Sequence, residues 1–405
     1  MTDLGLPRAE RPEEIGLSSE RLGRITATLR NDVERRLIPG AVMMIARGGR
    51  VGYAETFGFR DREAGAPMAL DAIFRIASMT KPMVSVAAMM LAEEGRLDLT
   101  APVADYIPEF AGLTVGVERR KAQRVMSVQD LLRHTSGLTY AAFGDSPVQM
   151  MWRDAKLMDE SQTNAELMAK LAQLPLMFEP GTTWEYSMST DVLGRVVEVA
   201  SGQDLASHIA ARIAGPLGLV DTGFAAEGRS ERIAQPQTDA SGQRPPMRDP
   251  SRPANWFSGG GGMVSTARDY LRFCQMLLDG GALDGTRLLA PKSVVHMASD
   301  HLPPGCEYGD TARSRFGALA PVPEMGYGFG LGFCVRKAQG MSPVPGSVGE
   351  FFWGGVHGTY FWIDPQQRMV VVVMMQAPDQ RLHYRYLSRH LVYGAITSPA
   401  GRRYR

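Results

Sequence analysis

Strand-like segments at both ends of the chain, with helical patterns between them, constrain the fold most. Residues 41–61 (AVMMIARGGRVGYAETFGFRD) combine β-forming residues with a Gly48-Gly49 turn, which predicts a hairpin. Near the C-terminus, residues 351–376 read as a strand region, the turn PQQR and a second strand. Because this order is neither alternating β and α nor repetitive, we expect an α+β protein with one antiparallel sheet assembled from both chain ends.

The remaining residues supply helices around this sheet. The middle of the chain is largely helical or loop-like, and a helical pattern closes it at about 380–395. No low-complexity tract or interdomain linker is present. We therefore expect a single domain over 1–405, with an α/β lobe at about 15–75 and 255–405 and a mostly helical lobe at about 76–254.

Composition and charge exclude several classes of partner. Lys and Arg number 44 against 43 Asp and Glu, so no overall field favours nucleic acid or a membrane surface. The longest apolar run, 369–375, is too short to span a bilayer as a helix, and the charged N-terminus lacks the apolar core of a signal peptide. Cys274, Cys306 and Cys334 form no CxxC pair and suit a reducing compartment. We expect a soluble cytoplasmic protein without nucleic-acid or membrane partners, and assembly into a homo-oligomer is compatible with the sequence.

The stretch RIASMTKPM (75–83) contains the S-x-x-K tetrapeptide of the chain, with Ser78 three positions before Lys81. Roughly one such match is expected by chance in a chain of this length, and a polar first turn of a helix would explain it. The residues that follow are apolar on almost every side, which predicts a buried helix. Ser78 would then lie at a helix N-terminus, where free N–H groups favour developing negative charge. A lysine one turn further into a buried helix requires a partner or a function.

Two competing enzyme signatures are missing. The sequence has no G-x-S-x-G, which argues against the nucleophile elbow of an α/β-hydrolase. The seven histidines form no HExxH, so we expect neither a metal site nor a cofactor.

Five segments in a fixed order resemble the serine β-lactamase and penicillin-binding-protein superfamily, and are most similar to the class C β-lactamase-like carboxylesterases, the family VIII esterases. The resemblance covers about 15 to 395 and implies the β-lactamase/DD-peptidase-like fold. The segments are FRIASMTKPMVSVAAMMLAEEGRLDLTAPVADYIPEF, SVQDLLRHTSGL (127–138), FEPGTTWEYSMSTDVLG (178–194), SGGGGMVSTARDYLRF (258–273) and FFWGGVHGTYFWIDP (351–365).

The resemblance implies the catalytic residues. Ser78 matches the acylated nucleophile, Lys81 matches the lysine of the first motif, and Tyr186 matches the tyrosine of the second. In such a trio the lysine and the tyrosine transfer the serine proton, because a serine hydroxyl is a poor nucleophile until a base takes its proton. Tyr and Lys have ordinary pKa values of about 10 and about 10.4, so one of them must titrate up to about three pH units lower to act near neutrality. A close Lys–Tyr pair titrates as a unit, which leaves the identity of the operative base open.

The resemblance also implies an oxyanion hole and the walls of a substrate site. The third motif, usually Lys-Thr-Gly on an edge strand, falls on Trp353, Gly354 and Gly355. The backbone N–H groups of Ser78 and Val356 would then stabilise the oxyanion.

Two departures from the lactamase pattern carry information about the substrate. Trp353 replaces a basic residue that helps to hold the substrate carboxylate in related lactamases and peptidases. Met188 stands where class C enzymes have the asparagine of Tyr-x-Asn, and methionine adapts to variable acyl groups. Both departures favour an uncharged ester, although Trp353 could instead be packed within the sheet. His357 could point into the cleft, where it would contact the leaving oxygen or the water of deacylation, or be a surface strand residue.

The leading hypothesis is therefore a carboxylesterase that hydrolyses short-chain esters through an acyl-Ser78 intermediate, with a small-molecule ester as its substrate. Acyl transfer to an alcohol acceptor uses the same intermediate, and a β-lactam or amide hydrolase would share the acylation machinery. A catalytically silent binding protein should have lost one of Ser78, Lys81 or Tyr186, and all three are present. Residues 139–160 and 239–257 are the candidate loops over the cleft.

Overall fold

The computed structural model, described for residues 3–239 and 241–398, contains an eight-stranded antiparallel sheet in the order β12-β13-β14-β15-β16-β1-β2-β3. The N-terminal hairpin joins the C-terminal strands through β1 and β16, which pair from Ala41 with Met375 to Arg47 with Met369. The α+β architecture and the sheet built from both chain ends are thus confirmed. The strands are β1 (Gly40–Arg47), β2 (Arg50–Asp61), β3 (Ala66–Pro67), β12 (Tyr327–Phe329), β13 (Cys334–Arg336), β14 (Phe351–Gly354), β15 (Tyr360–Asp364) and β16 (Met369–Met375).

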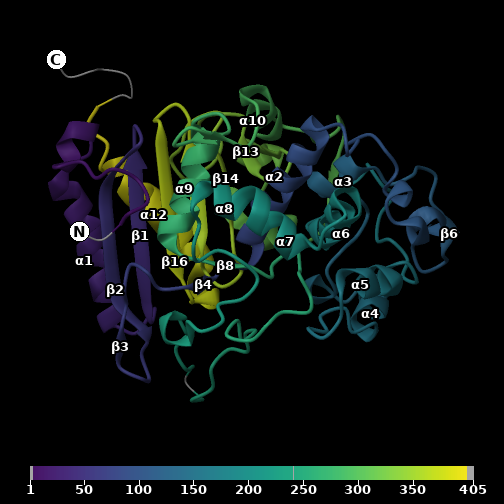
Figure 1. Ribbon diagram of the computed structural model, residues 1–405, viewed down its shortest axis with the longest axis horizontal. Helices are drawn as coiled ribbons and strands as arrows, with labels where there is room; N and C mark the ends of the chain where they lie inside the picture. Colours follow the sequence, from purple (N-terminus) through teal and green to yellow (C-terminus); the bar gives the residue numbers. More distant parts are fainter. Residues whose placement is uncertain (1–2, 240, 399–405) are drawn as a thin grey trace.

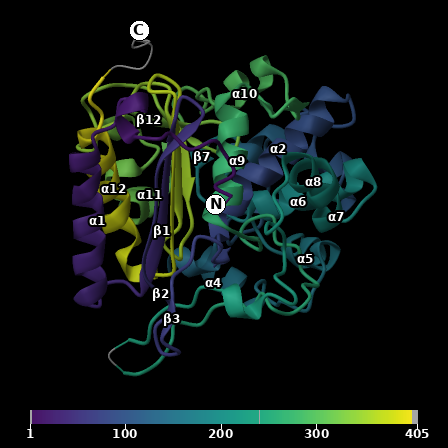
Figure 2. The ribbon, with the colours of Figure 1, turned by 60° about the vertical axis from the view of Figure 1, so that its left-hand side comes forward.

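Helices cover both faces of this sheet (Figure 2). On one face α1 (Ser19–Glu34) packs beside α12 (Arg381–Gly394), and on the other α9 (Ala267–Leu278) contacts the central strands β1, β15 and β16. Because both faces are covered, β1 and β16 are buried along their whole length, which explains the unbroken apolar run of β16.

The central helix α2 (Thr80–Glu93) connects the sheet to the helical part of the molecule, which lies at the right of Figure 1. Its residues from Thr80 to Leu91 are buried, as its sequence predicted, and it packs mainly on α6 (Ser189–Ser201). The division into two lobes near 75 and 255 stays a prediction. The other helices are α3 (Val128–Leu132), α4 (Pro147–Asp154), α5 (Asn164–Leu171), α7 (Leu205–Ile209), α8 (Gly215–Leu217), α10 (Pro291–Met297) and α11 (Ala312–Phe316), with a π-helical turn at Ala210–Ala214.

Short strand pairs and 3₁₀ turns complete the chain. The pairs are β4 (Phe74–Arg75) with β8 (Val264–Ser265), β5 (Thr114–Val115) with β6 (Arg120–Lys121), β7 (Thr183–Trp184) with β11 (Glu307–Tyr308), and β9 (Ala282–Leu283) with β10 (Thr286–Arg287). The 3₁₀ turns are Pro12–Ile15, Ala77–Met79, Val103–Asp105, Pro108–Gly112, Ala141–Phe143, Ser230–Arg232, Gly317–Leu319, Pro323–Met325 and Pro378–Gln380.

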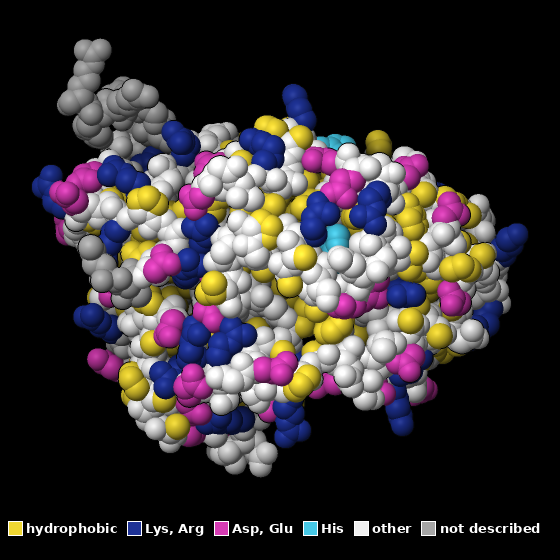
Figure 3. All heavy atoms as spheres, in the orientation of Figure 1, with side chains coloured by type: hydrophobic (Ala, Val, Ile, Leu, Met, Phe, Trp, Pro, Cys, Tyr) yellow, Lys and Arg dark blue, Asp and Glu magenta, His cyan; other side chains and the backbone are white. Residues whose placement is uncertain are grey.

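None of the described helices has both the length and the apolar composition to cross a bilayer. Positive and negative side chains are interspersed over the face shown in Figure 3, in keeping with the near-zero net charge. Across 3–239 and 241–398, no group of three or more His, Cys, Asp or Glu side chains could hold a metal ion.

A buried ion cluster joins the β13–β14 edge of the sheet to α12. Glu350, fully buried just before β14, accepts hydrogen bonds from Arg336 Nε at 2.8 Å and Arg389 Nη1 at 2.7 Å. The Tyr393 hydroxyl donates to the same carboxylate at 2.8 Å. The cluster therefore fixes the position of β14 relative to α12.

We expect Glu350→Ala to lower the free energy of unfolding by about 3 kcal/mol or more, because it leaves two buried guanidinium groups without their carboxylate. Urea denaturation followed by circular dichroism measures this change. Glu20→Ala, which removes an exposed partner of Arg24, is the control and should leave the midpoint unchanged. Equal midpoints for the two variants would contradict the structural role of Glu350.

Candidate active site

Ser78 lies in the 3₁₀ turn Ala77–Met79, which leads directly into α2. Ala77 has φ of 45°, in the left-handed region that favours glycine, so the backbone is strained immediately before the serine. Surrounding contacts hold this strained turn in place. The Tyr270 hydroxyl donates to Met79 O (2.8 Å), the Met263 amide donates to Thr80 Oγ1 (3.1 Å), and the Thr359 hydroxyl donates to Ile76 O (3.2 Å).

Lys81, one helical turn after Ser78, is almost fully buried with its ammonium group close to the serine. Its Nζ donates to Gly260 O at 2.7 Å and to the Tyr140 hydroxyl at 3.1 Å, and it lies 3.5 Å from Ser78 Oγ. The buried cation therefore has three oxygen partners, one of which is the serine itself. This places Lys81 where it can exchange a proton with Ser78.

Two tyrosines, rather than the single predicted one, surround this lysine. The ring centroid of Tyr186 lies 4.6 Å from Lys81 Nζ, while its hydroxyl accepts a hydrogen bond from Trp353 Nε1 at 3.1 Å. The hydroxyl bonded to Lys81 is that of Tyr140. Burial raises the pKa of Tyr140 well above its ordinary value, and the nearby Asp191 carboxylate acts in the same direction. Tyr140 lies two residues beyond the SVQDLLRHTSGL segment, and its spacing in the sequence gave no sign of its position.

Asp191, near the N-terminus of α6, is a second buried residue that the sequence did not reveal. It accepts hydrogen bonds from Ser258 Oγ at 2.5 Å and from the Gly260 amide at 3.0 Å, and burial raises the pKa of its carboxyl. A Cβ at Gly260 would lie 2.2 Å from the Asp191 carboxylate and 3.0 Å from the Tyr140 hydroxyl. The glycine run 259–262 thus lets the backbone come close enough for the Gly260 carbonyl to accept from Lys81.

The end of β14 lies against the serine turn. A Cβ at Gly355 would lie 2.5 Å from Ile76 O, and one at Gly354 would lie 2.7 Å from the Arg385 guanidinium. Arg385 Nη2 donates to the Gly355 carbonyl at 2.7 Å. Because the C=O and N–H of a trans peptide point in opposite directions, this bond turns the N–H of Val356 away from Arg385.

The predicted oxyanion hole consists of the backbone amides of Ser78 and Val356. Both residues line one cavity of about 970 Å³. Within the described ranges, neither amide donates a hydrogen bond to another protein group. Two such free N–H groups on one wall can stabilise a developing oxyanion.

Trp353 is buried behind Tyr186 rather than on the cavity wall. Its ring packs on Tyr186 at 5.1 Å, on Phe316 at 5.2 Å and on Phe329 at 5.2 Å between centroids. Its indole N–H is the donor that orients the Tyr186 hydroxyl. The geometry thus combines sheet packing with a polar contact, and a direct contact of Trp353 with substrate stays a prediction.

Met188, Gly354 and His357 line the cavity together with Ser78. His357 belongs to the turn between β14 and β15, so the structure favours the cleft over a surface strand position. Burial lowers the pKa of His357 to about 4, and the Arg75 guanidinium acts in the same direction. Both candidate loops also contribute to the cavity, through Phe143 and Trp152 in 139–160 and Met247 and Trp256 in 239–257.

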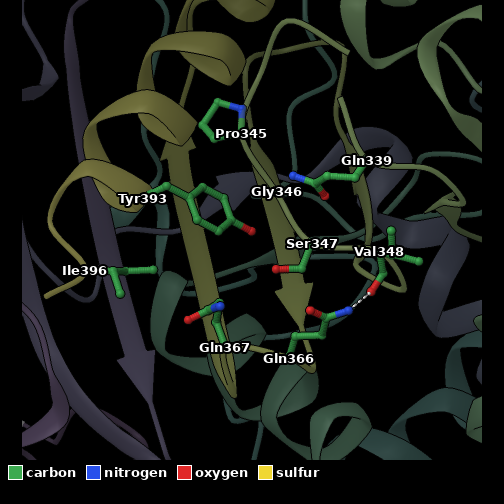
Figure 4. A pocket seen from close by; sticks show the side chains of 9 residues that line it. All are labelled: Gln339, Pro345, Gly346, Ser347, Val348, Gln366, Gln367, Tyr393 and Ile396. Carbon is green, nitrogen blue, oxygen red and sulfur yellow. Dashed lines mark hydrogen bonds between the residues drawn. The ribbon is translucent and has the colours of Figure 1, made fainter. Parts of the chain in front are cut away.

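A second pocket, of about 650 Å³, has no lining residue in common with the Ser78 cavity (Figure 4). Its polar groups already serve the protein: Ser347 Oγ donates to Asp364 at 2.7 Å, and Gln366 Nε2 donates to Val348 O at 2.9 Å. The Tyr393 hydroxyl lies 2.7 Å from Asp364 as well. Ser347, Gln366 and Tyr393 of this pocket are thus already hydrogen-bonded within the protein.

A sheet built from both chain ends, with a strained serine turn opening a buried helix, defines a protein of the serine β-lactamase and penicillin-binding-protein class. The family described as Beta-lactamase matches residues 25–393, so the chain belongs to the Beta-lactamase family. Protein Rv1367c of Mycobacterium tuberculosis is 35% identical over 369 residues, covering 87% of this chain and 90% of that protein. Esterase EstB of Burkholderia gladioli is 34% identical over 365 residues, covering 84% and 86%.

Two solved structures share the fold over almost the whole chain. EstCE1, described as a hydrolase with promiscuous acyltransferase activity, has a TM-score of 0.78 at 28% identity, with 92% of this chain and 98% of that chain covered. Unliganded Simvastatin Synthase (LovD) from Aspergillus terreus has a TM-score of 0.76 at 24% identity, covering 93% and 99%, a likeness of fold alone. The chain is thus a serine hydrolase of the β-lactamase-like esterase family.

The depressed pKa of His357 has a consequence for acid stability. A histidine whose pKa falls from about 6.5 in the unfolded chain to about 4 when folded binds fewer protons in the folded state, so stability falls as the pH drops through this window. We expect His357→Gln to lose less thermal stability than the wild type between neutral pH and about pH 4.5. Thermal midpoints of both proteins at both pH values measure the difference. Parallel decreases would show that His357 does not carry this proton linkage.

Proposed function

We propose that the protein hydrolyses short-chain carboxylic esters through an acyl-Ser78 intermediate. The observation that carries this proposal is the contact between Ser78 Oγ and the buried Lys81 ammonium, next to two tyrosines and two free amides of one cavity. Trp353 and Met188, in place of the lysine and asparagine of related lactamases, favour an ester over a lactam. We also propose a cytoplasmic location, and a homo-oligomer stays a prediction.

In the acylation step Ser78 Oγ attacks the ester carbonyl while its proton passes to the Lys81–tyrosine group, where an unprotonated Lys81 amine or a Tyr186 phenolate is the acceptor. The Tyr140 hydroxyl accepts a hydrogen bond from Lys81, and the Tyr186 ring lies over the same Nζ, so the three side chains form one contiguous cluster. The tetrahedral oxyanion lies between the Ser78 and Val356 amides, each worth about 10²–10³ in rate.

The leaving alcohol takes a proton from the same group, and water then attacks the acyl-enzyme. His357 is neutral near pH 7 because of its depressed pKa, so it can accept a hydrogen bond from that water or donate one to the leaving oxygen. Its place on the cavity wall supports this assignment.

Ser78→Ala should lower kcat/KM for para-nitrophenyl butyrate by about 10⁴-fold or more, because no acyl-enzyme can form. Release of para-nitrophenol measures this rate. Mass spectrometry after treatment with an alkyl phosphonate should show one adduct on the wild type and none on Ser78→Ala. Retained turnover in the variant would reject the proposed function.

Acyl transfer to an alcohol is the second candidate. The cavity of about 970 Å³ exceeds the needs of a short acyl group, and EstCE1 is described as having acyltransferase activity besides hydrolysis. A β-lactam or amide hydrolase remains a weaker alternative, because the same acylation step would serve it.

Product analysis in the presence of ethanol or butanol separates the two leading activities. For a hydrolase, we expect the free acid to remain the main product at alcohol concentrations that leave the protein folded. The rate of para-nitrophenol release gives total acylation, and gas chromatography gives the ratio of acid to alkyl ester. An excess of alkyl ester would identify an acyltransferase.

A further inference from the structure

We propose that the Ser78 cavity selects esters that also carry a carboxylate, which it holds through Arg315, Arg381 and Arg385. This inference rests on the proposed esterase function and names its substrate class. The carboxylate can belong to the acyl part or to the alcohol part, since the same guanidinium chemistry would hold either.

The three arginines come from two helices and meet at the same cavity. Arg381 and Arg385 are one turn apart on α12, so they share a face, and Arg315 lies in the last turn of α11. All three line the cavity that contains Ser78. They therefore place three positive charges on one part of its wall.

Arg315, Arg381 and Arg385 lack an acidic partner among the described residues, as do Lys156 and Arg248 of the same cavity. Arg153 pairs with Asp145 at 2.8 Å, whereas no carboxylate oxygen of the described residues lies within 4.0 Å of a nitrogen of Arg315, Arg381 or Arg385. Each of the three donates to backbone carbonyls only. The acceptors are Ala142 O for Arg315 (2.8 Å), Pro378 O for Arg381 (3.1 Å) and Gly355 O for Arg385 (2.7 Å).

A guanidinium has five N–H donors, so most of the donors in this cluster remain unused. The Nε atoms of Arg315 and Arg385 are buried and have no partner among the described residues. Arg385 itself is only 7% exposed. A buried cation that keeps unused donors is costly unless an anion completes it.

Electrostatics support the same conclusion. Burial lowers the pKa of Arg385 to about 10, and Arg381 acts in the same direction. Burial also lowers the pKa of Arg315, again with Arg381 adding to the effect. The acid that influences Arg315 is Glu185, but burial raises the pKa of Glu185 to about 7, so it is a weak counter-charge near neutrality. A bound carboxylate would relieve the repulsion among the three arginines.

Arg385 and Arg315 each contact a group that adjoins the proposed reacting residues. Arg385 contacts the carbonyl of Gly355, whose neighbour Val356 supplies a predicted oxyanion donor. The Arg315 guanidinium carbon lies 3.6 Å from the ring centroid of Phe143, and that ring stacks on Tyr186 at 6.0 Å. One side chain or peptide therefore separates each of these cations from the reacting groups.

This arrangement changes the substrate expected from the third motif alone. Because Trp353 stands in place of a basic residue, β14 carries no positive charge at this position. The arginines of α11 and α12 place positive charge at the same cavity. The expected preference for an uncharged ester follows from Trp353 alone and leaves out the charge on these two helices.

Two pairs of esters, matched except for one charge, test the proposal. For the acyl side the pair is mono-para-nitrophenyl adipate and para-nitrophenyl hexanoate. For the alcohol side it is para-acetoxybenzoate and its methyl ester. Each kcat/KM is divided by the rate constant for hydroxide-catalysed hydrolysis, which removes the intrinsic reactivity of the ester. The readout is the ratio of anionic to neutral ester.

We expect this corrected ratio to exceed one for at least one pair in the wild type and to fall about ten- to a hundredfold in Arg315→Gln and Arg381→Gln. Added salt should lower the ratio too. Arg153→Gln is the matched control, since Arg153 lines the same cavity but is already neutralised by Asp145, and it should leave the ratio unchanged. Arg385 is not substituted, because it also holds the Gly355 carbonyl.

The outcomes separate this inference from the proposed function. If Ser78→Ala hydrolysed every ester as fast as the wild type, the proposed esterase function itself would be rejected. A wild type that hydrolyses the neutral esters through Ser78, but shows a ratio at or below one for both pairs, would overturn the carboxylate inference alone. A ratio above one that Arg315→Gln and Arg381→Gln leave intact would overturn it as well.

Discussion

The close approach of the β14–β15 turn to the serine turn is the contact on which the rest of the site depends. Gly355 lies against Ile76, and the Thr359 hydroxyl donates to the Ile76 carbonyl, so the sheet supports the strained backbone at Ala77. A side chain at position 355 would separate the two turns. The same contact brings Ser78 and Val356 to one cavity, where their amides can form the proposed oxyanion hole.

The buried lysine imposes the second constraint. An ammonium group removed from water needs oxygen partners, and Lys81 finds them in Gly260, Tyr140 and Ser78. Gly260 can supply its carbonyl only because it lacks a side chain where Asp191 and Tyr140 come together. The surroundings of Ser78 and the packing of the helical part are thus joined by one hydrogen-bond network.

Substrate selection combines features that lie far apart in the chain. Trp353 orients Tyr186 from behind, Met188 lines the cavity, and the arginines of α11 and α12 contribute charge from the sheet side. The relative named Esterase EstB agrees with the chemistry proposed at Ser78, while the arginine cluster concerns which esters this chain accepts.

The sequence by itself determined the elements whose signals are local. The hairpin at 41–61, the buried helix after Ser78 and the apolar strand at 369–375 follow from hydrophobic periodicity and turn residues. The ordered motifs predicted Ser78, Lys81 and Tyr186 as the catalytic residues. Tyr140, Asp191 and the cluster of Arg315, Arg381 and Arg385 carry no such signal. Their positions depend on which distant segments pack together, and on burial that removes water from their charges. Only the tertiary structure decided these contacts, because periodicity reports the face of an element and not the neighbour that covers it.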